Sequence, residues 1–158
     1  MRYITKILMV AICLVALSGI VAACDVECKS PGYWKNHPNA WPVNSITIGN
    51  SLYTPGEAIE IMEQPVKGDK TYTMFDALVA AKLNVKNGCC PPCEISKIIG
   101  EANQWMIDHP LGNAEKRSVE ARDDAWQKET TNCYGCIKYH SGEFIYEKLD
   151  AFNNGYCH

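Results

Sequence analysis

The sequence lacks the short motifs that identify the common hydrolases, nucleotide-binding enzymes and cytochromes. It contains no GxSxG, no HExxH and no glycine-rich phosphate loop. Covalent haem requires a histidine directly after a CxxC pair, but Glu94 follows Cys93 and Ile137 follows Cys136. Neither repeats nor low-complexity segments are present. The residues therefore assign no reaction, and we expect a protein without enzymatic activity and without a cofactor.

An excess of basic charge is also missing. The 158 residues carry 15 lysines and arginines against 18 acidic side chains, which gives a net charge of −3. Loss of the first 23 residues, which include Arg2 and Lys6, would leave 13 basic side chains and a net charge of −5. Nucleic-acid-binding proteins generally present a basic surface. We therefore expect no nucleic-acid partner.

Only one long hydrophobic run occurs, and it stands at the N-terminus. A short basic segment precedes the apolar stretch 7–23, whose 17 residues fall short of the roughly 20 that a spanning helix needs. Small residues end this stretch just before Cys24. The pattern predicts a secretory signal peptide over residues 1–23 and a single domain over 24–158. We therefore expect a secreted, periplasmic or cell-surface protein.

The residues Val21-Ala22-Ala23 before Cys24 also resemble a bacterial lipobox. In that case Cys24 would be acylated, and a doubly acylated cysteine would hold the protein on a membrane face. Ordinary cleavage at the same place would release a soluble protein, and the two alternatives stay open. We expect membrane association only through such a lipid or through an uncleaved N-terminal anchor helix.

Cysteine, in contrast, is abundant. One of the nine cysteines lies in the predicted signal peptide, which leaves eight in the mature chain. A dense, even set in an exported chain predicts a disulfide framework, whose connectivity the sequence leaves open. A bridge from Cys28 or Cys24 to Cys157 would join the two ends of the domain. Beside Cys24, the disulfide candidates are Cys28, Cys89, Cys90, Cys93, Cys133, Cys136 and Cys157.

Helical signals dominate the rest of the chain. Capping residues and apolar spacing predict helices from Thr54 to Pro65, over 74–86, from Cys93 to His109, and from Ser141 to 153–155. Weak alternation around a Gly-Asn pair predicts a β-hairpin over 45–53. The charged stretch 113–129 is typical of a solvated helix. The predicted fold is a mainly α, small, disulfide-stapled helical domain with one short β-hairpin, preceded by a signal peptide.

The segment 32–42, GYWKNHPNAWP, gathers three aromatic residues and two prolines. Proline keeps the preceding residue out of the α region, so we expect a shaped loop with at most one helical turn. Its aromatic residues, Tyr33, Trp34 and Trp41, are candidates for stacking on a sugar or polymer. We favour the alternative that they fill the core, with His37 as a hydrogen-bonding residue of the loop.

Cys90 and Cys93 form a CxxC pair at the start of a predicted helix, where thiol–disulfide enzymes lower a thiol pKa. No βαβ pattern surrounds this pair, and Cys89 adds a third thiol. We therefore favour structural disulfides here.

A second cluster, Cys133-x-x-Cys136 followed by His140, has the spacing of a zinc knuckle. In an oxidising compartment the two thiols would pair before they met a metal ion. We therefore expect no metal, and Cys133, Cys136 and His140 remain only an alternative metal site.

A resemblance to a known family rests on several segments taken together: GYWKNHP at 32–38, WPV at 41–43, ITIG at 46–49, YT at 53–54, AAKLN at 80–84, and FNNG at 152–155 with the closing Cys157. In this combination the chain resembles an uncharacterised prokaryotic family of exported or cell-surface proteins. The resemblance implies export and a similar fold, and it supplies no catalytic residue. The cysteines between residues 89 and 136 depart from the family pattern.

These patterns favour a non-enzymatic exported or envelope-anchored module for structure or binding, without identifying its ligand. An envelope component or a glycan is the expected partner. One alternative is a thiol–disulfide redox protein of the envelope that uses Cys90 and Cys93. The other is a metal-binding envelope protein that uses Cys133, Cys136 and His140.

Overall fold

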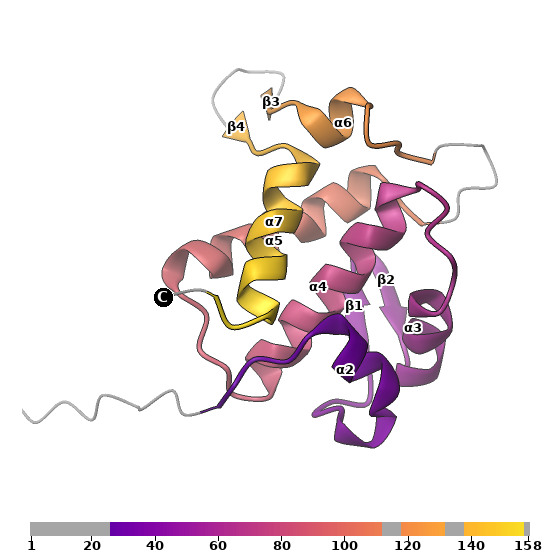
Figure 1. Ribbon diagram of the computed structural model, residues 1–158, viewed down its shortest axis with the longest axis vertical. Coiled ribbons are helices and arrows are strands. Elements are labelled where there is room, and N and C mark those ends of the chain that lie inside the picture. Colours follow the sequence, from indigo (N-terminus) through magenta and orange to yellow (C-terminus); the bar gives the residue numbers. More distant parts are fainter. Residues whose placement is uncertain (1–25, 112–117, 132–137, 157–158) are drawn as a thin grey trace, which may run out of the picture.

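The computed structural model describes residues 26–111, 118–131 and 138–156 (Figure 1). Outside these ranges lie the predicted signal peptide at 1–23 and four of the eight cysteines that follow it: Cys24, Cys133, Cys136 and Cys157. Helices dominate the described residues, as predicted. None of these helices is both long and apolar enough to cross a membrane.

The elements follow one another as α2 (Pro31–Asn36), the 3-10 helix η1 (Pro38–Ala40), β1 (Ile46–Ile48), β2 (Ser51–Tyr53), α3 (Pro55–Met62), α4 (Lys70–Lys86), α5 (Cys93–Asp108), α6 (Asp124–Gln127), β3 (Thr130–Thr131), β4 (Lys138–Tyr139) and α7 (Gly142–Asn153). The predicted mainly helical fold with a short hairpin is confirmed, because β1 and β2 pair antiparallel around Gly49. A second antiparallel pair, β3 with β4, was not predicted. Strands of two residues carry too little alternation to be recognised.

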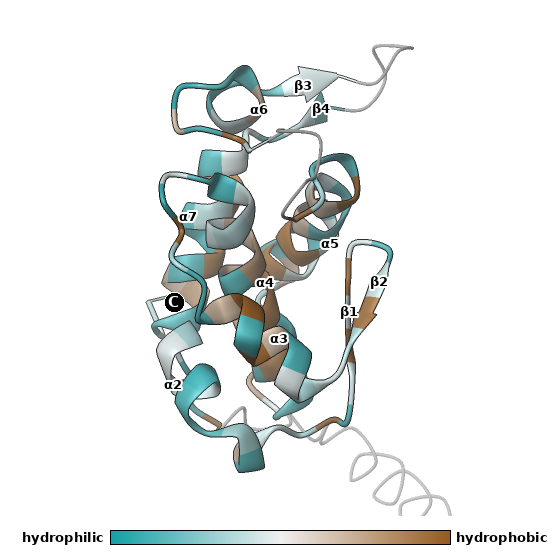
Figure 2. Ribbon diagram, turned by 90° about the vertical axis from the view of Figure 1, so that its right-hand side faces the viewer, coloured by the Kyte–Doolittle hydropathy of each residue, from teal (hydrophilic) through white to brown (hydrophobic). Residues whose placement is uncertain are grey.

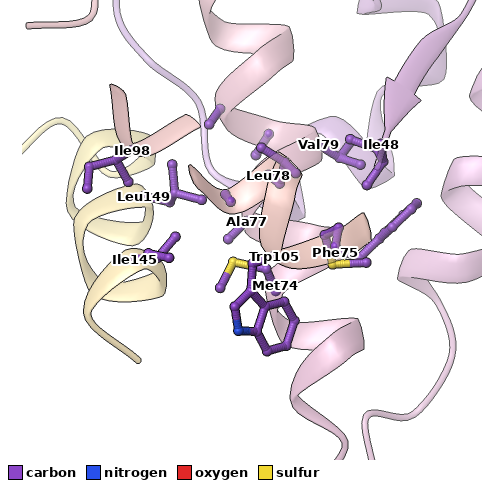
Figure 3. Close-up of a cluster of buried hydrophobic side chains, with 14 of the residues drawn as sticks. Ile48, Met74, Phe75, Ala77, Leu78, Val79, Ile98, Trp105, Ile145 and Leu149 are labelled. Carbon is purple, nitrogen blue, oxygen red and sulfur yellow. The ribbon is translucent and has the colours of Figure 1, made fainter. Parts of the chain in front are cut away.

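Helix α4 lies at the centre of the molecule. It packs against α2, α3, β1, α5 and α7. Figure 3 shows Ile98, Ile145 and Leu149 on one side of this helix and Ile48 on the other. The sequence predicts a single apolar stripe on α4, but its buried residues occupy most of the circumference. Because neighbouring elements pack on several sides of α4, even its small alanines are buried. Its buried residues therefore do not follow the 3.6-residue spacing of a helix with a single apolar face.

Local capping residues locate the starts of α3 and α7 correctly. Thr54 and Glu57 form the predicted capping box at α3, and the Ser141 hydroxyl caps α7. The start of α4 is the exception, since its cap is Asp69 and not Thr73. A helix over 74–86 would be capped by Thr73, but the Asp69 side chain accepts a hydrogen bond from the Thr71 backbone N–H and starts the helix at Lys70. Helix α4 is therefore one turn longer than predicted.

The segment 32–42 begins with a longer helix than predicted. Helix α2 spans six residues, because the Ser30 hydroxyl caps it and Pro31 suits its first turn. Trp34, on this helix, is only 1% exposed. Trp41 donates a hydrogen bond from Nε1 to the Trp34 carbonyl at 3.0 Å. The segment thus folds back on itself around one buried indole.

Two fully buried asparagines join the N-terminal arm, α4 and α7. Asn84 Oδ1 accepts hydrogen bonds from Trp34 Nε1 at 3.1 Å and from the Lys29 backbone N–H at 2.8 Å. Asn84 Nδ2 donates to the Lys29 carbonyl at 2.8 Å and to Asn153 Oδ1 at 2.9 Å. Asn153 Nδ2 donates to the Ala77 carbonyl at 2.9 Å. The segments GYWKNHP, AAKLN and FNNG each contribute one side chain to this asparagine network.

A disulfide between Cys28 and Cys89 lies beside the asparagine network, with 5.4 Å between the two Cα atoms. The pairing of Cys28 with Cys157, considered from the sequence, is therefore wrong. Asn84 holds the backbone of Lys29 at the end of α4, and Gly88, at φ +96°, turns the chain back toward this point. Cys28 and Cys89 thus meet because both flank the same helix end.

Candidate functional site

A cavity of about 340 Å3 opens between α5, α6, β4 and the start of α7, at the end of the molecule where β3 and β4 lie in Figure 1. Helix α5 supplies one wall, because Glu101, Gln104, Trp105 and Asp108 recur at helical spacing. The opposite wall comes from α6 and the two short strands. We call this cavity the His140 pocket, after the histidine that joins β4 to α7.

His140 is held by a carboxylate of α5. Its Nδ1 lies 2.8 Å from Glu101 Oε2, and its backbone N–H donates to the same oxygen at 3.2 Å. The imidazole ring stacks on Phe144 with 4.3 Å between ring centroids. Since a carboxylate only accepts, Nδ1 carries the proton and Nε2 is the ring atom left for a ligand. The side chain of Glu101 is only 10% exposed, so the surrounding protein restricts its movement and holds it against His140.

Trp105 forms the floor of the pocket. Its Nε1 donates to the Ala125 carbonyl at 3.1 Å, which ties α6 to α5. The His109 ring stacks on it at 4.5 Å, and Trp126 meets it edge-on at 6.0 Å. At Gly142 a Cβ would lie 2.8 Å from Trp126 and 3.0 Å from Trp105. The first residue of α7 must therefore be glycine for both indoles to pack.

Replacement of Gly142 by alanine is expected to destabilise the fold by about 1–3 kcal/mol, because the methyl group overlaps two indole rings. Denaturant unfolding and the near-ultraviolet circular dichroism of the tryptophans measure this. Gly100→Ala is the matched control, since no atom lies within 4 Å of a Cβ built at Gly100 on α5. Alanine is the better helix former, so this control should gain about 0.5–1 kcal/mol. Equal effects would contradict the packing role of Gly142.

Most of the other lining residues are polar, and Ala125 and Ile145 are the apolar exceptions. Asp108 accepts from Gln104 Nε2 at 3.1 Å, and Asp124 pairs with Lys128 at 2.9 Å. Glu129 pairs with Lys138. Two of the four lining carboxylates, Asp124 and Glu129, are thus paired with lysines, and the pocket offers many hydrogen-bonding groups.

Of the aromatic residues considered as ligand-facing, Trp34 is buried in the core and does not face solvent. Tyr33 and Trp41 are half-buried and pack against that core. His37 stacks on Tyr33 at 4.2 Å, and its Nδ1 lies 2.8 Å from the Tyr33 carbonyl. These contacts account for the whole segment as packing and loop geometry.

The cysteines separate into different states. Cys90 is disulfide-bonded, as is the Cys28–Cys89 pair, whereas Cys93 is a free, exposed thiol in the described part of the chain. Cys93 as a disulfide candidate is therefore corrected. Cys93 is the first residue of α5, and its side chain is exposed to solvent. A closed Cys90–Cys93 pair, which the redox alternative uses, is not formed.

Of the alternative metal site, only His140 is described, because Cys133 and Cys136 lie outside the described residues. Within the described ranges no three histidine, cysteine, aspartate or glutamate side chains are grouped as a metal site. Glu101, the partner of His140, was missed. No local pattern could have shown it, since 39 residues separate it from His140.

One buried carboxylate has no obvious structural role. Asp76, on α4, has an Oδ1 atom that is buried and without a hydrogen-bond partner among the described residues. Burial raises the pKa of Asp76 to about 7, although the positive charge of Lys35 opposes this. The Asp76 charge in turn contributes to the raised pKa of Tyr146, which burial mainly causes.

Replacement of Asp76 by asparagine is expected to stabilise the protein at pH 8 by on the order of 2 kcal/mol. The folded state binds the Asp76 proton more tightly than the unfolded state does. The contribution of the Asp76 carboxyl group to the free energy of unfolding is therefore fully present below about pH 4 and is lost as the pH rises toward 7. The advantage of the variant should accordingly grow from pH 4 to 7 and then level off, which denaturant unfolding across pH measures. A constant difference at every pH would contradict this.

No protein-family profile matches the chain, and no curated protein or solved structure is significantly similar to it.

Proposed function

We propose that this chain is an exported, non-enzymatic binding module whose His140 pocket takes a sugar unit of an envelope glycan. The observation that carries the proposal is the pocket itself, a cavity of about 340 Å3 at the lower end of the range for small-molecule sites. Export is supported by the Cys28–Cys89 disulfide, since such bonds persist in oxidising compartments. The same proposal keeps both alternatives for the N-terminus, acylation of Cys24 and ordinary cleavage before it.

The pocket lining suits a ligand rich in hydroxyl groups. Carboxylates accept hydrogen bonds from hydroxyls, and the Gln104 amide and Tyr139 hydroxyl both donate and accept them. Ile145 adds an apolar patch for the carbon face of a sugar ring. Because Asp124 and Glu129 are paired with lysines and Glu101 is bonded to His140, a neutral ligand suits this pocket better than an anionic one.

Titration with tri-N-acetylglucosamine and with maltotriose, followed by NMR of the His140 ring protons, tests this proposal. We expect saturable shifts with at least one sugar. Gln104→Ala should weaken that binding about tenfold, because one hydrogen bond to the ligand is lost. Gln64→Ala is the matched control, since Gln64 is exposed at the end of α3 and bonds only the Glu60 carbonyl. Absence of saturable shifts, or an equal effect of the control, would overturn the sugar site.

A second candidate is zinc binding by His140 with Cys133 and Cys136. The favouring observation is Glu101, because zinc-bound histidines usually donate their other ring N–H to a carboxylate. Zinc content after exhaustive dialysis tests it. Glu101→Gln should lower zinc affinity about 10-fold or more, whereas Glu94→Gln, also on α5, should not. A protein that retains no zinc would exclude this function.

A further inference from the structure

A second cavity lies on the other side of α5 and shares no residue with the His140 pocket. Its volume is about 600 Å3, and it runs between the β1–β2 hairpin, the end of α4 and the start of α5. Figure 2 shows the hairpin standing beside these helices, with a hydrophobic stretch on β2. We call this cavity the hairpin groove. Its apolar lining consists of Val43, Ile46, Leu52, Val85, Pro91 and Ile99.

Two of these apolar side chains are unusually exposed. Leu52 is 68% exposed and Val85 is 38% exposed, and they are two of only four large hydrophobic residues exposed among the described ranges. Leu52 stands opposite Thr47 in the hairpin, on the face that turns away from the core. A polar residue is the usual choice at such a position. Half of the exposed large hydrophobic side chains of the described residues therefore lie at this groove.

The charged groups of the groove are all positive. Lys82 and Lys86 line it, and no aspartate or glutamate does, although the protein as a whole carries a net charge of −3. Lys82 is half-buried and has no carboxylate within ion-pair distance in the described part of the chain. A partly buried ammonium group without a counter-ion favours a bound anion.

The Lys82 ammonium is also held in place. Its Nζ donates to the Thr47 carbonyl at 2.7 Å and to Asn103 Oδ1. An ammonium group has three donors, so one N–H remains for a ligand. Burial lowers the pKa of Lys82, because it disfavours the charged form. An anionic group in the groove would relieve this.

From this combination we infer that the hairpin groove binds a single-chain anionic amphiphile of the fatty-acid class. The carboxylate lies against Lys82 and Lys86, and the acyl chain lies along the apolar wall that includes Leu52, Val85 and Ile99. Small-molecule sites typically combine such an apolar lining with few polar groups that fix the ligand. This site is independent of the sugar proposed for the His140 pocket.

Isothermal titration of the purified protein with laurate, below its micellar concentration, tests the inference, with dodecanol as the neutral probe of equal chain length. We expect one saturable site for laurate and binding at least about tenfold weaker for dodecanol. No saturable laurate binding, or equal affinities for the two probes, would overturn the inference. Binding only to phosphatidylglycerol vesicles, and not to free laurate, would also overturn it in favour of a membrane surface.

Opposite charges at one position supply the matched control. Val85→Glu should weaken laurate binding about tenfold, whereas Val85→Lys should bind it at least as tightly as the wild type. Leu52→Glu and Leu52→Lys repeat the test at a more exposed position, where folding is least affected. Equal laurate affinity for the glutamate and lysine variants of a pair would show that charge in the groove is irrelevant. The affinity of the His140 pocket for sugar should be the same in all four variants.

Discussion

Replacement of Asn84 by aspartate is expected to destabilise the folded protein by about 4 kcal/mol. The change keeps the size of the side chain but replaces the Nδ2 donor with an oxygen. That oxygen would face the Lys29 carbonyl and Asn153 Oδ1, both of which are acceptors. Two buried hydrogen bonds would be lost. The new carboxyl group would either carry a buried charge or stay protonated with a strongly raised pKa.

Denaturant unfolding followed by tryptophan fluorescence measures this effect. Asn50→Asp is the matched control, because Asn50 is exposed in the hairpin turn and the chemical change is the same. The control should change the free energy of unfolding by less than about 0.5 kcal/mol. Similar values for the two variants would show that the asparagine network contributes little to stability. Asn153→Asp should resemble Asn84→Asp, since the two residues share one hydrogen bond.

Removal of the Cys28–Cys89 disulfide is expected to cost a comparable amount, about 4 kcal/mol. The two cysteines are 61 residues apart, so the bond closes a large loop and restricts the unfolded chain strongly. The double variant Cys28→Ser with Cys89→Ser avoids a stray thiol. Because Cys28 adjoins Lys29, we also expect faster amide exchange in the N-terminal arm.

Cys93→Ser provides the control for the disulfide variant. It removes an exposed, free thiol and should change the free energy of unfolding by less than about 0.5 kcal/mol. Thiol titration before unfolding should detect Cys93 in the wild-type protein and lose it in this variant. A double serine variant as stable as the wild type would contradict the role of the Cys28–Cys89 bond.

The helical class, the hairpin and most helix starts were predictable because their signals are local. Thr54 and Ser141 cap helices through contacts with residues three positions later. Gly49 provides the left-handed turn between two short strands. The start of α4 was not predictable in this way, because Thr73 is followed by an acidic residue three positions later and Asp69 is not. Only the structure shows that the Asp69 side chain accepts a hydrogen bond from the Thr71 backbone N–H.

The sequence by itself determined that this protein would be mainly helical, rich in cysteine and built around the segments that hold Trp34 and Asn84. Only the tertiary structure decided that these two side chains hydrogen-bond, that Cys28 pairs with Cys89, and that Glu101 holds His140. Each of these contacts joins residues 39 to 61 positions apart. Their geometry depends on how the helices pack around α4, and no short-range pattern of residues specifies that packing.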